Sequence, residues 1–65
     1  MLIKVNANPV EVQTDSLADA LVELGYTSPA IATALNGSFV SKAARAKTTL
    51  KSGDALEVLA PMQGG

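Results

Sequence analysis

One short helical pattern, with strand-like segments before and after it, is the feature that most limits how this chain can fold. Its apolar residues recur at the i, i+3, i+4 and i+7 positions of one helix face: Leu17, Ala20, Leu21 and Leu24. Asp19 and Glu23 fall on the polar side. A helix of about two and a half turns is marginal in isolation, so we expect this face to be buried against a sheet.

Both ends of the predicted helix carry boundary signals. Ser16 with Asp19 three residues later approximates a capping box in which Asp replaces the usual Glu, and Asp15 is an alternative cap. Gly25 follows the last apolar position and suits the left-handed residue that ends many helices.

A hairpin is predicted before the helix. Residues 2–6 alternate, with Ile3 and Val5 on one face, and residues 10–13 alternate again. Residues 6–9 contain two Asn and a Pro, which are typical of a turn.

A second hairpin is predicted after the helix. Asn36-Gly37 lies between the segments 31–35 and 38–40, and this dipeptide is a strong signal for a two-residue hairpin turn. Residues 41–49 are polar and irregular, although three alanines there allow a helical turn. Leu50 is expected to fill the core from below.

A final strand is predicted over residues 55–60, after a turn at residues 51–54. Alternation places three of its residues on the core face and two on the other face: Leu56, Val58 and Ala60, then Glu57 and Leu59.

These elements predict a two-layer α+β domain, with a four- to five-stranded mixed sheet packed on one main helix. If the final strand lies parallel beside the first, its C-terminal end projects from one end of the sheet. That arrangement is the β-grasp, or ubiquitin-like, fold. Pro61 cannot donate to a ladder, so we expect a domain over residues 1–60 and a flexible tail over residues 61–65.

Composition limits the function. The 65 residues include no Cys and no His, so a disulfide, a thiolate metal site and the usual general base are excluded. With no evident acid/base constellation, we do not expect an enzyme, and we expect no metal and no bound cofactor. No apolar run approaches a membrane span and no secretory signal is present, so a cytoplasmic location is expected, without a membrane partner. The net charge of −1 argues against a nucleic-acid partner.

Charge is uneven along the chain. Residues 1–41 hold one Lys and four acids, 1 − 4 = −3, whereas residues 42–65 hold four basic residues and two acids, 4 − 2 = +2. The basic residues are Lys42, Arg45, Lys47 and Lys51. They predict either a solvated loop, which we favour, or a docking rim for an acidic partner.

The chain ends in Gly64-Gly65. Glycine has no Cβ, so such an end can thread a narrow channel in a partner. The carboxylate of Gly65 is then the group that we expect to be activated as an acyl donor. An incidental Gly-Gly is the alternative interpretation.

Three apolar residues are candidates for a partner surface. Leu59 and Leu2 point away from the predicted core face, and two such residues near each other on neighbouring strands would form a binding patch. Phe39 is ambiguous between core and surface.

The whole chain resembles the ThiS family, the sulfur carriers of thiamine biosynthesis. The resemblance rests on the opening hairpin with Asn6, the helix segment 17–25, and the segments 34–37, 50–54 and 62–65. The family often has Pro then Arg after the fourth strand and a Trp shortly beyond, whereas this chain has Ser41, Lys42 and alanines. That departure bears on the partner surface more than on the carrier role.

The resemblance implies a mechanism. An E1-like enzyme would bind the domain and use MgATP to adenylate Gly65. A persulfide donor would then give a Gly65 thiocarboxylate, and thiazole synthase would accept the sulfur. Gly64 would fit a tight channel, and Gln63 and Met62 are candidates for tail recognition, with a plain linker as the alternative.

Three rival functions stay open. The chain could be a carrier for molybdopterin synthesis or another thiolation pathway, although those subunits are usually longer. It could be a ubiquitin-like modifier, because the activation step is the same. It could also be a β-grasp interaction module in which Gly-Gly is incidental.

Overall fold

The computed structural model describes residues 1–60. Within this range the elements follow in the order β1 (Leu2–Val5), β2 (Asn8–Glu11), α1 (Leu17–Glu23), β3 (Ala32–Leu35), β4 (Ser38–Val40), the 3₁₀ helix η1 (Lys42–Lys47) and β5 (Ala55–Leu59). The predicted tail, residues 61–65, lies outside the described residues.

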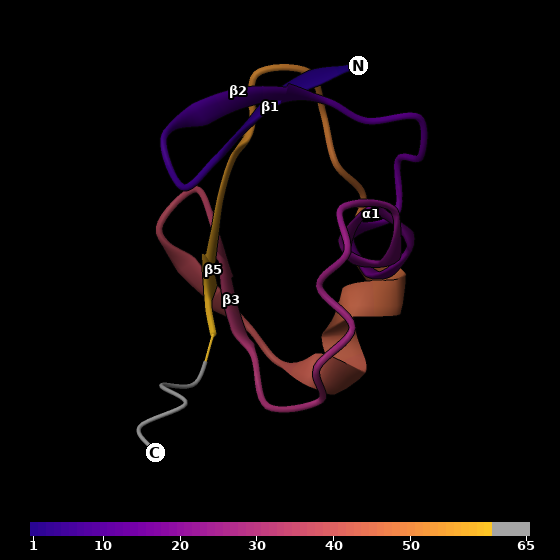
Figure 1. The fold of residues 1–65 in the computed structure, drawn as a ribbon, viewed down its shortest axis with the longest axis vertical. Helices are drawn as coiled ribbons and strands as arrows, with labels where there is room; N and C mark the ends of the chain where they lie inside the picture. Colours follow the sequence, from indigo (N-terminus) through magenta and orange to yellow (C-terminus); the bar gives the residue numbers. More distant parts are fainter. Residues whose placement is uncertain (61–65) are drawn as a thin grey trace.

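The five strands form one mixed sheet in the order β2-β1-β5-β3-β4. Strand β5 is parallel to β1 and antiparallel to β3, so the final strand joins two hairpins that are far apart in the sequence. Figure 1 shows α1 and η1 together on one side of the sheet. This is the predicted β-grasp fold.

The core lies between the sheet and α1. Leu17, Ala20 and Leu21 are buried, which confirms the predicted helix face. They meet the inward residues of the sheet and of the connections: Ile3, Val5, Val12, Ile31, Val40, Leu50, Leu56 and Val58. Leu50 is 2% exposed, as expected for a residue that fills the core. Each large aliphatic side chain buried in this way contributes about 1.5–3 kcal/mol.

The first hairpin has a tighter turn than the sequence predicted. Only Asn6 and Ala7 form it, with φ of 50° and 73°, and Asn8 and Pro9 already belong to β2. Two residues with positive φ suit the twist of a hairpin. Pro9 is tolerated because β2 is an edge strand, where a residue without an N–H leaves no neighbour unpaired.

The start of α1 is held differently from the predicted capping box. Ser16 is the N-cap residue, but its side chain makes no cap hydrogen bond. Instead, the N–H of Leu17 donates to the carbonyl of Thr48 at 2.9 Å. A distant segment thus satisfies one of the donors that a helix leaves open at its N-terminus. At the other end, Gly25 has φ of 90°, as predicted.

The remaining elements follow the prediction with small changes. Asn36 and Gly37 form the second hairpin turn, with φ of 51° and 85°. The alanine-containing segment forms η1, whose cap Ser41 accepts a hydrogen bond from the N–H of Ala44. Ala60 was expected on the core face, but β5 ends one residue earlier and Ala60 is exposed.

The N-terminus is tied to the edge of the sheet. The ammonium group of Met1 lies 2.7 Å from the Glu11 carboxylate and also donates to the carbonyl of Val12 at 2.7 Å. Because the N–H of Gly53 donates to the carbonyl of Leu2, this end of the chain lies beside the start of β5. None of the helices within residues 1–60 is long and apolar enough to cross a membrane.

Candidate functional site

The candidate modified residue, Gly65, and the candidate recognition residues Gly64, Gln63 and Met62 lie outside the described residues. The structure does describe where the chain leaves the sheet. Strand β5 runs in the middle of the sheet and ends at Leu59, two residues before Pro61. The surface around Leu59 is therefore the part of the domain next to the tail.

The outer face of the sheet, away from α1, carries an apolar hollow. Alternation turns Ala32 and Ala34 of β3 outward, between Phe39 of β4 and Leu59 of β5. Phe39 and Leu59 are 73% and 74% exposed. Two small residues between two large ones leave a depression of about 340 Å³, which we name the outer groove. Its lining residues are Asn6, Ala32, Thr33, Ala34, Phe39, Glu57, Val58 and Leu59.

The ambiguity about Phe39 is resolved by this geometry. Its neighbour Val40 is buried, so the alternation of β4 directs the Phe39 ring outward. Phe39 and Glu57 are both paired with Ala34, from opposite sides. The outer groove thus combines apolar walls with one carboxylate.

Leu2 and Leu59 would form a shared patch only if they lay near each other, and the structure places them far apart. Leu2 is exposed on β1, but the parallel register pairs Lys4 with Ala55. Leu2 lies two positions before Lys4, and Leu59 lies four positions after Ala55. Their separation is roughly 20 Å at the rise of a β-strand. Neighbouring strands were predicted correctly, but the register places the two leucines at opposite ends of the sheet.

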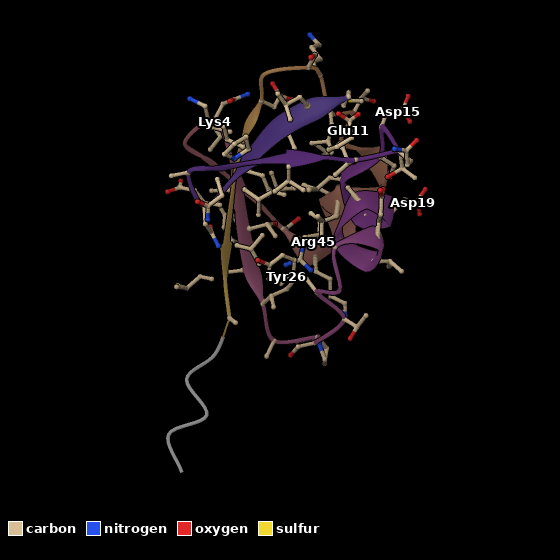
Figure 2. All side chains as sticks on the ribbon, turned by 45° about the horizontal axis from the view of Figure 1, so that its top comes forward. Lys4, Glu11, Asp15, Asp19, Tyr26 and Arg45 are labelled. Carbon is tan, nitrogen blue, oxygen red and sulfur yellow. The ribbon has the colours of Figure 1, made fainter. Side chains whose placement is uncertain are left out.

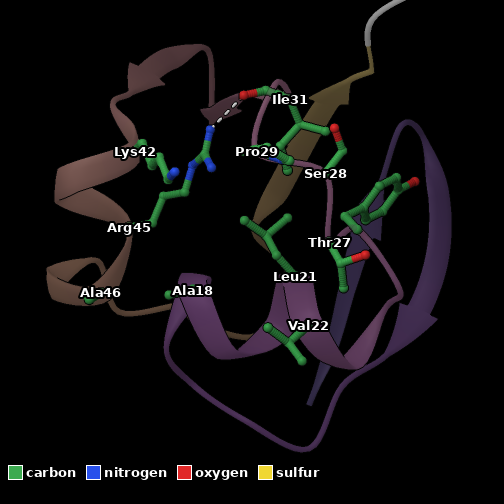
Figure 3. Close-up of a pocket in the computed structure, with 11 residues that line it drawn as sticks. Ala18, Leu21, Val22, Thr27, Ser28, Pro29, Ile31, Lys42, Arg45 and Ala46 are labelled. Carbon is green, nitrogen blue, oxygen red and sulfur yellow. Dashed lines mark hydrogen bonds between the residues drawn. The ribbon is translucent and has the colours of Figure 1, made fainter. Parts of the chain in front are cut away.

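A second hollow lies on the other side of the molecule, between α1, η1 and the loop 26–31. It measures about 330 Å³, and its walls are mainly apolar. Figure 3 shows the Arg45 side chain of η1 reaching Ile31, with Lys42 beside it and with Leu21 and Val22 of α1 below.

Arg45 corrects the interpretation of the basic segment. Both the solvated loop and the docking rim require exposed charges, but Arg45 is only 8% exposed. Its Nη2 donates to the carbonyl of Ile31 at 2.8 Å, and its Nε donates to the hydroxyl of Thr33 at 3.2 Å. Figure 2 shows its side chain between the sheet and α1. Arg45 is a structural residue, whereas Lys42, Lys47 and Lys51 are exposed.

Polar groups near the helix are also used internally. Both oxygens of the Glu23 carboxylate accept from the N–H of Gln13 at 3.0 Å, so α1 is fastened to the end of the first hairpin. Within residues 1–60, no buried side-chain nitrogen or oxygen lacks a hydrogen bond. In the same range, no three acidic, His or Cys side chains are grouped so that they could hold a metal ion.

Asn6 was named in the sequence only as part of the opening hairpin. In the structure its carboxamide contacts Val58 of β5 with both polar atoms, at 2.9 and 3.2 Å. The sequence indicated a turn at Asn6, since Asn is common in turns. It gave no sign of the hydrogen bonds to Val58, because Val58 is 52 residues away.

Comparison with known proteins gives one consistent result. The model of the family described as "ThiS family" matches residues 3–65. No curated protein sequence matches the chain. A crystal structure of a thiamine biosynthesis protein (ThiS) from Geobacter metallireducens is 32% identical, with a TM-score of 0.78 and complete coverage of both chains. A solution structure of a thiamine biosynthesis protein from the same organism is 31% identical, with a TM-score of 0.82, and covers 100% of this chain and 88% of that one.

Proposed function

The chain belongs to the ThiS family, and from that membership we propose that it is a sulfur carrier of thiamine biosynthesis whose Gly65 is converted to a thiocarboxylate. The observation that carries the proposal is that the family match extends through residue 65 and so includes the Gly-Gly end. The two similar structures, which are named as thiamine biosynthesis proteins, support the same assignment.

The proposed reaction begins with adenylation. An E1-like enzyme binds MgATP and the carrier, and a carboxylate oxygen of Gly65 attacks the α-phosphorus of ATP. The bond between the α-phosphorus and the bridging oxygen breaks, and pyrophosphate leaves. The oxygen of a carboxylate is a poor leaving group. Adenylation converts the carboxylate into an acyl phosphate anhydride, from which AMP is a good leaving group.

Sulfur transfer then follows in two steps. The terminal sulfur of a persulfide donor attacks the acyl carbon and expels AMP. A thiol then cleaves the resulting sulfur–sulfur bond, leaving a thiocarboxylate on Gly65 and the thiol oxidised to a disulfide. Thiazole synthase accepts the sulfur. These steps need no catalytic side chain in the carrier; its task is to present the tail.

The outer groove is the proposed docking surface for the adenylating enzyme. An enzyme that receives the tail must contact the surface from which the tail leaves, and Leu59 adjoins both the groove and the tail. Exposed Phe39 and Leu59 supply large apolar anchors of the kind found at the centres of interfaces. The small side chains of Ala32 and Ala34 leave room for a protruding residue of the enzyme.

Intact-mass spectrometry tests the function directly. The carrier is incubated with its cognate E1-like enzyme, MgATP, a persulfide donor and a thiol. We expect the mass to rise by the difference between one sulfur and one oxygen atom, and to return to its first value when thiazole synthase and its substrates are added. No change in mass, with an enzyme that is active on its own control substrate, would contradict the carrier function. Attachment to lysines of other proteins would favour a modifier.

A further inference from the structure

Asn6 directly follows β1 and is hydrogen-bonded to β5. Its backbone N–H donates to the carbonyl of Leu56 at 2.9 Å. Its side-chain Oδ1 accepts from the N–H of Val58 at 2.9 Å, and its Nδ2 donates to the carbonyl of Val58 at 3.2 Å. The φ of 50° turns the main chain away toward β2 at this point. The side chain therefore continues toward β5 where the backbone does not.

The carboxamide takes the place of a peptide group that β1 lacks. In a parallel ladder, the residue that donates to Leu56 would accept from the N–H of Val58 with its own carbonyl. The residue two positions later would then donate to the carbonyl of Val58. Oδ1 and Nδ2 of Asn6 make these two hydrogen bonds, so β1 is in effect one peptide unit longer on the β5 side than on the β2 side.

We propose that Asn6 is a positioning residue for the carrier reaction: by fixing the backbone of Val58, it sets the direction in which Leu59 and the tail leave the sheet. This inference rests on the proposed function. Val58 is paired with Thr33 on one side and bonded to Asn6 on the other, whereas Leu59 is paired with Ala32 of β3. Val58 is thus the last residue of β5 that is held on both sides within the described chain.

The hydrogen bonds between Asn6 and Val58, which we call the clamp, also set how far Gly65 can extend from the sheet. From Val58 to Gly65 there are 65 − 58 = 7 residues, which span at most about 25 Å when extended. Without the Asn6 hydrogen bonds, the end of β5 is held by β3 alone. The adenylating enzyme then has to order this segment on docking. Ordering roughly one further residue weakens binding about fivefold to tenfold.

The chain offers a matched control at its second hairpin turn. Asn36 has the same left-handed backbone as Asn6, with φ of 51°, and its Oδ1 accepts from the N–H of Ala55 at 2.9 Å. It therefore also bonds the β5 backbone, but at the end of the strand remote from the tail. Asn6→Ala and Asn36→Ala each remove side-chain hydrogen bonds to β5, and only the first acts near the tail.

The test compares hydrogen exchange with kinetics. We expect Asn6→Ala to speed exchange of the Val58 amide and to raise the KM for the carrier in pyrophosphate release by about fivefold to tenfold, with kcat within about twofold. Asn36→Ala should speed exchange at Ala55 and leave KM unchanged. Asn6→Asp keeps an acceptor for the Val58 N–H but loses the donor, so its KM should fall between those of the wild type and Asn6→Ala. It also serves if Asn6→Ala does not fold.

Three outcomes would overturn the inference. If the wild-type chain is adenylated but Asn6→Ala shows an unchanged KM, the clamp is only structural and the carrier function stands. If both Asn variants raise KM in proportion to their loss of stability, the position near the tail has no special role. If the wild-type chain itself releases no pyrophosphate, the proposed function fails and takes this inference with it.

Discussion

Arg45 donates through Nε to the hydroxyl of Thr33 at 3.2 Å, and both side chains are buried. The Thr33 hydroxyl in turn donates to the carbonyl of Val40 at 2.9 Å. One guanidinium therefore links η1 to the hairpin of β3 and β4. The N–H groups of the Arg45 guanidinium therefore stabilise the fold and are not presented to solvent.

Replacing Arg45 should be far more damaging than replacing a neighbouring lysine. Arg45→Ala leaves the carbonyl of Ile31 without its donor and opens space beside the core, so we expect a loss of about 2–3 kcal/mol in the free energy of unfolding. Arg45→Lys should recover little, because an ammonium group cannot reproduce both bonds. Lys47→Ala, at an exposed position of η1, should change it by less than about 0.5 kcal/mol. Urea unfolding measures all three; equal effects at residues 45 and 47 would contradict this account.

Ala7→Gly should stabilise the protein. Ala7 has φ of 73° in the first hairpin turn, where the equivalent position of the second turn is Gly37. A side chain in this region costs about 1–2 kcal/mol, and the greater freedom of glycine in the unfolded chain offsets part of the gain. We expect a net gain of about 0.5–1 kcal/mol, seen as a melting temperature raised by roughly 2–8 °C. The reciprocal change, Gly37→Ala, should lower it; a fall with Ala7→Gly would show that the Ala7 side chain makes a stabilising contact.

The outer groove predicts which apolar residues matter for docking. Leu59→Ser and Phe39→Ser should raise the KM for the carrier in adenylation by about tenfold or more, while the melting temperature changes little because both side chains are mostly exposed. Leu2→Ser is the matched control, since Leu2 is also exposed but lies at the other end of the sheet. Equal loss of activity in all three variants would point to a docking surface other than the groove.

Asp54 predicts a small acid-dependent loss of stability. The side chain of Asn36, at 3.1 Å, and the N–H of Lys51, at 2.8 Å, hold the pKa of the Asp54 carboxyl below its ordinary value of 3.8. Because the pKa is lowered in the folded state, this contribution is complete above the ordinary pKa and is lost as the pH falls through the folded pKa.

Two measurements check the Asp54 prediction. In Asn36→Ala, the pKa of Asp54 should rise, as followed by NMR of its carboxyl group. In Asp54→Asn, urea unfolding should show lower stability at neutral pH and a smaller further loss below about pH 4. An unchanged pKa in Asn36→Ala would mean that the Lys51 N–H alone sets it.

Removal of Gly65 should separate stability from function. The buried hydrophobic residues of the described chain run from Ile3 to Val58, so the melting temperature should stay within about 2 °C of the wild type. Adenylation should be lost because the new terminal carboxylate, on Gly64, reaches one residue less far into the enzyme. A large fall in melting temperature would show that the end of the chain supports the fold.

The parts of the fold that depend on local pattern were predictable from the sequence. The helix face of Leu17, Ala20 and Leu21, the turn at Asn36-Gly37 and the alternation of β5 each follow from neighbouring residues, and the structure has them all. The boundaries of β2 were harder to predict. Pro9 favours a turn unless its strand is known to lie at the edge of the sheet, as β2 does.

The features that local pattern could not predict are set by distant contacts. Ser16 needs no side-chain cap because Thr48 satisfies the N–H of Leu17, and no signal near Ser16 announces this. In the sequence, nothing distinguishes Arg45 from the exposed lysines near it. Its burial depends on contacts with the distant residues Ile31 and Thr33. Leu2 and Leu59 were separated by the strand register, which depends on the pairing of Lys4 with Ala55.

The place of β5 in the middle of the sheet has a consequence for synthesis on the ribosome. A nascent chain that stops before Ala55 has two hairpins and a helix but no strand to join them, and an isolated hairpin is marginal in water. Folding must therefore wait until translation has passed Leu59, six residues before Gly65. Copies terminated before β5 would stay unfolded and open to proteases, so the pool of folded molecules would be enriched in copies that extend past β5.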